Sequence, residues 1–461
     1  MNTYLALTRL ARLQWLLGDI AAGKLAAGAA IAALEALGRP AGLAMAYAVM
    51  AQLHLLDDTE TAAQDWGQRA LALANQLGDT EAQVHALNTV GAAEMASADS
   101  PKAWARMQRS LDMALAHGWA DHVARAYSNL VIHALVHRKV ADWTRLCDEA
   151  LAYCQARDFD LYALRLRVRR AHGLIECGHW ASAERELREV QVYAGAAEMD
   201  RQQAAHLLAL IGLRRGGAAA RAERSYWLDL LAGRRQLRPS PWYAPVAIAC
   251  AEAAWLLDQP ETLLTLVNQA WPQALGIGEP WRCGQLAVWL RRLGQLQQSP
   301  KLALAAPCRA ELAGDLDAAA AAWRAVENPY EEAVCLLGGN QAQLRRALGL
   351  FEQLGAEPAA AMARARLRSL GQHTGLRGLN KATRADPLGL TARERGLLRD
   401  LAEGQSNRDI ALRWHRSIRT VEHHVSALLS KLELGSRREV AAFVGRQPAH
   451  PTLAPSRQVL S

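Results

Sequence analysis

The amino-acid sequence predicts an all-α protein with a long array of paired helices and a small helical module near the C-terminus. Residues 1–370 are rich in alanine and leucine, and their apolar residues recur at helical spacing. Short turns interrupt this pattern at a constant interval, which indicates a structural repeat. A cluster of helix-start signals follows residue 386, where a separate module is expected to begin.

The turns in the N-terminal part of the chain recur every 40 residues. The turn residues are Gly38, Gly78, Gly118 and Asp158, and the apolar residues in phase with them are Ile31, Leu71, Leu111 and Leu151 before the turns and Ala46, Ala86, Ala126 and Leu166 after them. A period of this length with two helices per repeat is typical of a tetratricopeptide-like solenoid, because each helix pair must stack on a neighbour to bury its apolar stripe. Turn-like segments at Gly178 and Gly314 extend the predicted repeats over residues 1–370.

The positive charge of the chain is concentrated at its C-terminal end. Residues 371–461 contain 15 Lys and Arg against 8 Asp and Glu, a net charge of +7 out of a total of +8, which leaves +1 for residues 1–370. A basic excess at one end indicates a polyanionic partner there. A solvated basic face or tail would produce the same charge pattern.

The sequence lacks the usual signals for secretion and for membrane insertion. The first 17 residues have no basic leader and no small-residue cleavage site. The longest near-apolar run, residues 41–56, is shorter than the ~20 residues that span a bilayer. Seven scattered cysteines without a C-x-x-C motif argue against a disulfide framework and a zinc ribbon. We therefore expect a cytoplasmic protein with no membrane partner, no metal and no cofactor.

A basic linker, a module of four helices and a flexible tail are predicted after the repeats. The linker is expected at residues 371–386, the module at 387–447 and the tail at 448–461. The capping-box pairs are Thr391 with Glu394, Ser406 with Asp409 and Ser436 with Glu439, while Ser417 can cap a helix alone. The predicted helices are 392–403, 407–414, 418–432 and 437–445. About three residues separate the second helix from the third, which is the spacing of a helix-turn-helix.

The third predicted helix has one apolar face and one polar face. The apolar stripe consists of Val421, Val425, Leu428, Leu429 and Leu432, and the opposite face carries Arg419, Glu422, His423, Ser426 and Ser430. Such a helix fits the major groove of DNA, where short side chains near its start reach base edges. The basic residues placed to meet phosphates are Arg413, Arg416, Arg419, Lys431, Arg437 and Arg438.

The C-terminal module resembles the LuxR-type DNA-binding domain of bacterial regulators. The resemblance rests on Gly389-Leu-Thr-Ala-Arg-Glu, Ala402-Glu-Gly-Gln-Ser-Asn and Thr420-Val-Glu-His-His-Val-Ser-Ala-Leu-Leu-Ser-Lys-Leu. It implies dimerisation through the last helix, base contacts from Glu422, His423 and Ser426, and phosphate contacts from Arg416, Ser417, Arg419, Thr420, Lys431, Arg437 and Arg438. Trp414 and Arg416 stand where the family usually has aliphatic residues, so we expect the turn to pack differently or to be weakened.

Two upstream stretches, beginning at Trp323 and Ala347, are similar to the end of the helical sensor region of large MalT-like regulators. Those regulators carry an ATPase domain before their repeats, whereas this chain is expected to begin inside the helical region. Residues Gly18 to Lys24 do match the phosphate-loop pattern G-x-x-x-x-G-K. However, Leu25 replaces the Ser or Thr that binds magnesium, and no strand is predicted before it, so we interpret the string as an inter-helix turn.

These observations predict a transcription regulator and not an enzyme. We expect it to bind double-stranded DNA as a homodimer, while its repeats sense a ligand or a partner protein in signal transduction. RNA polymerase is a further candidate partner. Two alternatives stay open at this stage: a helical-repeat adaptor whose terminal module no longer binds DNA, and a nucleotide hydrolase.

Overall fold

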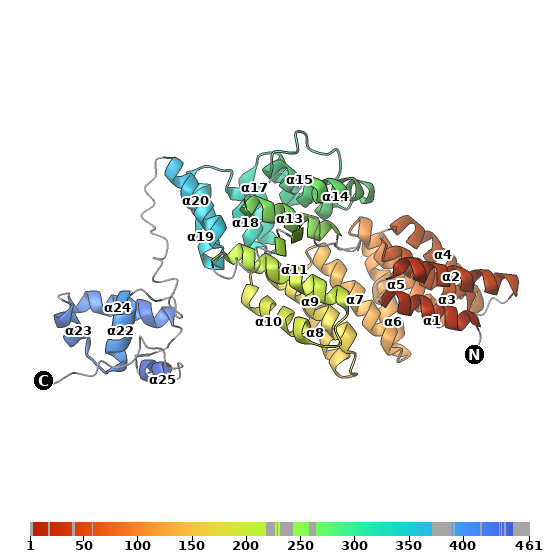
Figure 1. Ribbon diagram of the computed structural model, residues 1–461, viewed down its shortest axis with the longest axis horizontal. Coiled ribbons are helices and arrows are strands. Elements are labelled where there is room, and N and C mark those ends of the chain that lie inside the picture. The colour runs from red at the N-terminus through yellow and green to blue at the C-terminus, as the bar shows by residue number, and fades with distance from the viewer. Residues whose placement is uncertain are drawn as a thin grey trace. The chain divides into compact units, whose positions relative to one another are not determined.

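A computed structural model describes residues 3–16, 19–38, 42–57, 59–217, 226–227, 229–230, 243–257, 264–370, 390, 392–414, 417–432, 434, 436–437 and 439–445. Every regular element in these ranges is a helix, as Figure 1 shows. The chain divides into two compact units, Met1–Gln372 and His373–Ser461. The predicted linker at 371–386 and the predicted tail at 448–461 lie outside the described residues.

The first unit begins as a regular succession of antiparallel helix pairs. The helices are α1 (Thr3–Leu16), α2 (Ile20–Ala36), α3 (Leu43–Leu55), α4 (Glu60–Leu77), α5 (Thr80–Ser97), α6 (Pro101–Ala116), α7 (Ala120–Val136), α8 (Val140–Gln155), α9 (Asp160–Glu176), α10 (Trp180–Val192) and α11 (Glu198–Arg215). Each helix packs on the next, and α3, α5, α7, α9 and α11 also contact one another in succession. The chain therefore forms the repeat-like array of paired helices that the sequence predicts.

The 40-residue period arises from turns that require an unusual backbone conformation. Gly38, Gly78, Gly118 and Asp158 have φ values of 57°, 68°, 68° and 54°, in the left-handed region. Glycine adopts this conformation without steric cost, and Asp tolerates it better than most residues do. The predicted turns at Gly178 and Gly314 also have positive φ values, 82° and 86°. At each of these positions one helix has ended and the chain turns toward the next.

Small side chains let neighbouring helices of the array approach closely. Ala86, Ala126 and Leu166, which share one phase of the period, are all 0% exposed. At Gly173 on α9, a Cβ atom would overlap the ring of Trp143 on α8. The alanine-rich composition therefore provides close helix packing as well as helix propensity.

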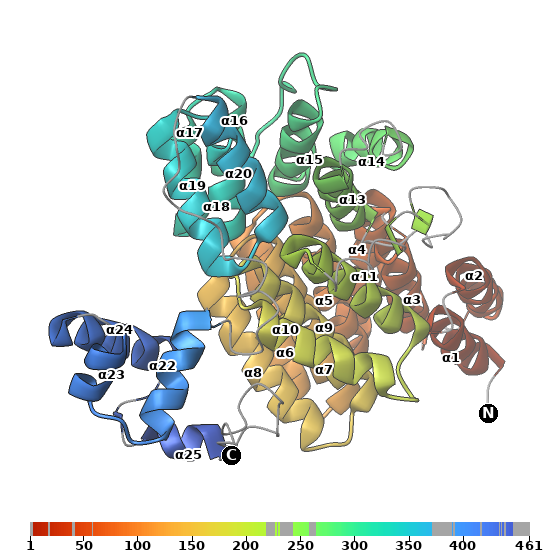
Figure 2. The same cartoon turned by 60° about the vertical axis from the view of Figure 1, so that its left-hand side comes forward.

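The later helices of the first unit fold back onto its middle. They are α13 (Tyr243–Leu257), α14 (Leu264–Ile277), α15 (Pro280–Arg292), α16 (Ala306–Leu312), α17 (Leu316–Ala325), α18 (Pro329–Leu336), α19 (Gln341–Leu354) and α20 (Glu357–Ser369). In Figure 2 the helices α16–α20 form a group of their own at the upper left.

Asn328, which caps α18, donates a hydrogen bond of 2.5 Å to Glu176 at the end of α9. Arg138 forms an ion pair of 3.2 Å with the same carboxylate. Although burial disfavours the charged form, Arg138 and His172 lower the pKa of Glu176 to about 2.

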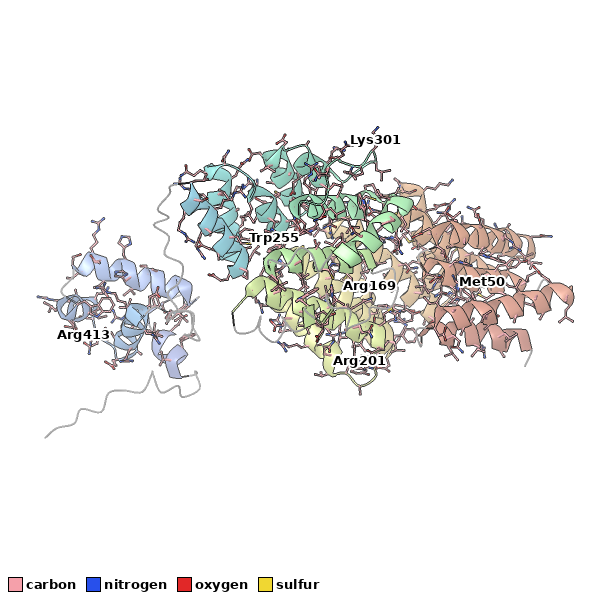
Figure 3. The ribbon with its side chains drawn as sticks, turned by 45° about the horizontal axis from the view of Figure 1, so that its top comes forward. Met50, Arg169, Arg201, Trp255, Lys301 and Arg413 are labelled. Atoms are coloured by element: carbon pink, nitrogen blue, oxygen red, sulfur yellow. The ribbon has the colours of Figure 1, made fainter. Side chains whose placement is uncertain are left out.

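Polar side chains form hydrogen bonds and an ion pair between the successive helices α5, α7, α9 and α11. The pairs are Glu81 with His122, Thr89 with Arg125, Asn88 with Asn129, Ser128 with Arg169, and Arg165 with Asp200. Figure 3 labels Arg169 within the array. Most of these residues are buried, so their mutual hydrogen bonds offset the cost of removing them from water.

Residues 20–24 of the phosphate-loop-like string are helical. Gly23 and Lys24 lie inside α2, whose first turn is capped by Asp19 through a 2.9 Å hydrogen bond from the backbone N–H of Ala22. Lys24 forms an ion pair of 2.5 Å with Asp57. Within the described residues, no group of three or more His, Cys, Asp and Glu side chains is arranged to hold a metal ion. None of the described helices has the length and apolar character needed to cross a membrane.

Candidate nucleic-acid interface

The described residues of the second unit form four short helices around one apolar core. They are α22 (Ala392–Ala402), α23 (Asn407–Arg413), α24 (Ile418–Lys431) and α25 (Glu439–Gly445). The buried core residues are Leu390, Leu397, Leu398, Leu401, Ile410, Ala411, Val421, Val425, Leu428 and Val440. Helix α22 contacts both α24 and α25, and α23 contacts α24. The four helices predicted from the sequence are confirmed, with ends that differ by at most two residues.

Side-chain caps define where these helices begin. Ser406 and Asp409 form a complete capping box at the start of α23. Hydrogen bonds from Ser406 lower the pKa of the Asp409 carboxyl. The hydroxyl of Ser417 accepts a 3.1 Å hydrogen bond from the backbone N–H of Thr420, so α24 is capped as expected. Ser436 donates a 2.8 Å hydrogen bond to Glu439 at the start of α25. The remaining predicted box includes Thr391, which lies outside the described residues.

Helix α24 presents a polar face away from the core. Val421 and Leu428 are 0% exposed and Val425 is 8% exposed, so they anchor the helix. Leu429 and Leu432 pack partly buried against the same core, which completes the predicted apolar stripe. The three predicted base-contacting residues, Glu422, His423 and Ser426, are all exposed. The structure therefore places these three side chains on one accessible surface of a single helix.

Four of the seven predicted phosphate-contacting residues have side chains that the structure describes, three at the start of α24 and one just before α25. Ser417 and Arg419 are exposed, and Thr420 is half-buried with its hydroxyl 2.7 Å from that of Ser417. Arg437 donates a 3.0 Å hydrogen bond to the side-chain oxygen of Asn407, which joins the start of α25 to the start of α23. Arg416, Arg438 and the side chain of Lys431 lie outside the described residues.

Trp414 lies at the C-terminal end of α23. This residue packs partly buried against the domain core. The guanidinium of Arg393 lies 5.2 Å from the centre of the Trp414 ring, and the ring of the exposed residue His424 lies 6.3 Å away. The Trp414 side chain therefore contributes to the core and lies near side chains of both α22 and α24.

Sequence reasoning missed three features of this unit. Arg413, expected to meet phosphates, forms an ion pair with Asp400 of α22; Figure 3 labels Arg413 in this unit. Leu412 and Ile418 are 68% and 47% exposed although both are large and apolar. The helical period could have indicated that Leu412 and Ile418 fall outside the buried stripe. The partner of Arg413 could not be found in this way, because it lies on another helix.

Comparisons with known proteins agree with this geometry. Residues 388–444 match the family described as bacterial regulatory proteins, luxR family. The chain is 46% identical over 54 residues to the uncharacterized transcriptional regulatory protein YhcZ of Bacillus subtilis, covering 12% of this chain and 25% of that protein. It is 46% identical over 63 residues to the DNA-binding transcriptional activator DevR/DosR of Mycobacterium tuberculosis, covering 13% and 29% respectively. It is 44% identical over 54 residues to the response regulator protein VraR of Staphylococcus aureus, covering 12% and 26%.

The matched segment coincides with the four-helix unit. Residues 388–444 form a luxR-family helix-turn-helix DNA-binding domain, and a large all-helical region precedes it. The chain spans between 25% and 29% of the length of these relatives. The matches therefore assign a family to the C-terminal unit alone. They do not cover the helices that precede it.

Proposed function

We propose that this protein is a sequence-specific DNA-binding regulator of transcription that inserts α24 into the major groove. The proposal rests on one observation. The side chains of Glu422, His423 and Ser426 are exposed on a helix that a buried apolar stripe holds against the domain core. A single α-helix fits the major groove, where each base pair presents a distinct pattern of donors and acceptors. Related proteins bear the names DNA-binding transcriptional activator and transcriptional regulatory protein, which supports this function.

In this proposal, base reading and phosphate binding are divided between different residues. Glu422, His423 and Ser426 read base edges. The phosphate-binding residues are Arg416, Ser417, Arg419, Thr420, Lys431, Arg437 and Arg438. The net charge of +7 in residues 371–461 supplies the general attraction to DNA. Phosphate contacts set the register of the domain on the duplex, and base contacts select the sequence.

We further propose that two copies bind DNA together, with α25 as the dimerisation helix. Helix-turn-helix dimers bind half-sites separated by about one helical turn of DNA, so the operator should be an inverted or direct repeat. RNA polymerase is the partner through which such a complex would change transcription. Because the partner is bacterial chromosomal DNA, the proposed location is the cytoplasm.

The array is proposed to act as the regulatory part of the protein. We assign residues 1–370 to a tetratricopeptide-like region that binds a ligand or a partner protein, 371–386 to a basic linker, 387–447 to the DNA-binding domain and 448–461 to a flexible tail. The stacked helices support this role, because helical-repeat arrays present extended surfaces to partners. The relation of the array to MalT-like regulators stays a prediction from sequence.

Selection of binding sites from random DNA by the full-length protein tests the proposal. We expect one enriched motif, and Glu422→Ala or His423→Ala should change the preferred bases, since each base contact contributes ~1–3 kcal/mol of discrimination. Glu403→Ala is the matched control, because Glu403 is an exposed acid that follows α22 and is not part of α24. Enrichment of no sequence would favour the adaptor function, and an unchanged motif in both α24 variants would refute the assigned reading face.

A further inference from the structure

One apolar side chain stands at the start of the proposed recognition helix and takes no part in the domain core. Ile418 is the first residue of α24 and is 47% exposed. The core of the domain is formed by other residues of the helix, namely Val421, Val425 and Leu428, with Leu429 packed beside them. Exposing a branched aliphatic side chain has a hydrophobic cost, which a contact with an apolar group would remove.

The position of Ile418 aligns it with two of the proposed base-reading residues. Ile418, Glu422 and Ser426 follow one another at intervals of four residues, so they form one row along α24. Residues near the start of a recognition helix are those that contact base edges. The Ser417 cap holds the first turn of α24 in place, which positions Ile418 relative to Glu422.

The major groove offers such a side chain one specific apolar partner. Among the four bases, only thymine carries a methyl group in this groove, at C5, and apolar side chains recognise it by direct contact. We propose that Ile418 contacts the 5-methyl group of a thymine in each half-site and thereby helps to determine which sequence is bound. This inference rests on the proposed function and adds a specificity-determining residue to it.

The geometry of the row also limits where this thymine lies. Four residues of α-helix rise about 6 Å, and successive base pairs are about 3.4 Å apart. The thymine read by Ile418 therefore lies within about two base steps of the base read by Glu422. Glutamate accepts a hydrogen bond from the N4 amino group of cytosine. We expect a thymine close to a cytosine in the preferred half-site.

The test uses the full-length protein and its selected duplex. Each thymine of one half-site is replaced singly by deoxyuridine, which removes the 5-methyl group and keeps the base pairing. Dissociation constants at one salt concentration are measured for the wild type, Ile418→Ala, Ile418→Val and Leu412→Ala. Leu412→Ala is the matched control, because Leu412 is apolar and 68% exposed but lies on α23.

At one thymine position, deoxyuridine should weaken binding of the wild type and of Leu412→Ala about fourfold, which corresponds to ~0.8 kcal/mol for one methyl group. The same replacement should leave Ile418→Ala unaffected, whereas Ile418→Val should retain part of the penalty. The inference is overturned if no thymine shows a penalty, or if Ile418→Ala keeps the full penalty. If Ile418→Ala weakens binding while deoxyuridine has no effect at any position, Ile418 contacts protein or backbone instead. Failure to enrich any sequence would overturn the proposed function itself.

Discussion

Arg413 at the end of α23 forms an ion pair with Asp400 on α22, and the carboxylate is 6% exposed while the arginine side chain is 51% exposed. The pair joins the first helix of the DNA-binding domain to the helix that precedes its turn. Because the acid is buried, the ion pair offsets part of the cost of removing the carboxylate from water. Arg413 therefore has a structural role that its basic character alone did not indicate.

Replacing Arg413 should affect the stability of the domain more than its phosphate contacts. Arg413→Ala leaves the buried Asp400 carboxylate without this cation. The free energy of unfolding should fall by about 1 kcal/mol, a small loss for a buried acid, because the Arg413 side chain is half exposed. Hydrogen–deuterium exchange of α22 and α23 in the full-length protein should become faster. Arg419→Ala is the matched variant, and its hydrogen–deuterium exchange should stay as in the wild type. Because one phosphate contact is lost, the slope of log K against log salt for DNA binding should become less steep by about 0.9. Faster exchange in Arg419→Ala together with a less steep salt slope in Arg413→Ala would contradict the structural role of Arg413.

The array should contribute little to the electrostatic part of DNA binding. Residues 1–370 carry a net charge of only +1, against +7 for residues 371–461. The slope of log K against log salt depends on the number of phosphates neutralised. A fragment starting at Gly371 should thus show nearly the same slope per protomer as the full chain on one duplex. A full-length slope steeper by several units would reveal a basic groove in the array and contradict the proposed division of roles.

Acid should destabilise the array through two buried histidines. Burial, His137 and Arg169 lower the pKa of His133 to about 3, and burial together with His172 lowers the pKa of His206 to about 3. Between these values and the unfolded pKa of about 6.5, the unfolded chain binds more protons, so stability falls as the pH falls through this window. At pH 5 each histidine should cost about 2 kcal/mol relative to pH 7.5.

Thermal unfolding of the full-length protein at pH 7.5 and pH 5 measures this effect. His133→Leu should reduce the difference between the two pH values, because it removes one titrating group from the core. His179→Leu is the control, since His179 is exposed at the start of α10. An equal pH dependence in the wild type and His133→Leu would show that His133 does not cause the loss of stability.

Two glycines in helices should respond oppositely to alanine. At Gly173 a Cβ atom would overlap the Trp143 ring, so Gly173→Ala should lower the free energy of unfolding by about 1–3 kcal/mol. At the exposed Gly349 on α19 nothing lies within 4 Å of a Cβ atom, so Gly349→Ala should raise it by about 0.5–1 kcal/mol through helix propensity. Urea unfolding of both variants checks the prediction, and a stabilising Gly173→Ala would show that the helices can move apart without cost.

The sequence by itself determined the turns of the regular repeats and, to within two residues, the ends of the four C-terminal helices. The sequence predicts caps at Ser406 and Ser417, and the structure places both at helix starts. It predicts turns at Gly78 and Gly118, and both have positive φ values. These features depend on the local backbone and on side chains within a few residues, so spacing and residue type are enough to find them. The same reasoning placed Glu422 and His423 on the exposed face of α24, because helical periodicity assigns each side chain to a face.

Only the tertiary structure decided which distant helices meet. Asn328 bonds to Glu176 across 152 positions of sequence, and Arg138 bonds to Gln285 across 147. No period connects these residues, because their contacts join helices that are far apart in the sequence. The pairing of Arg413 with Asp400 likewise required the packing of α23 on α22. Local chemistry specifies the elements of this protein, whereas the partners of its buried charges follow from how those elements stack.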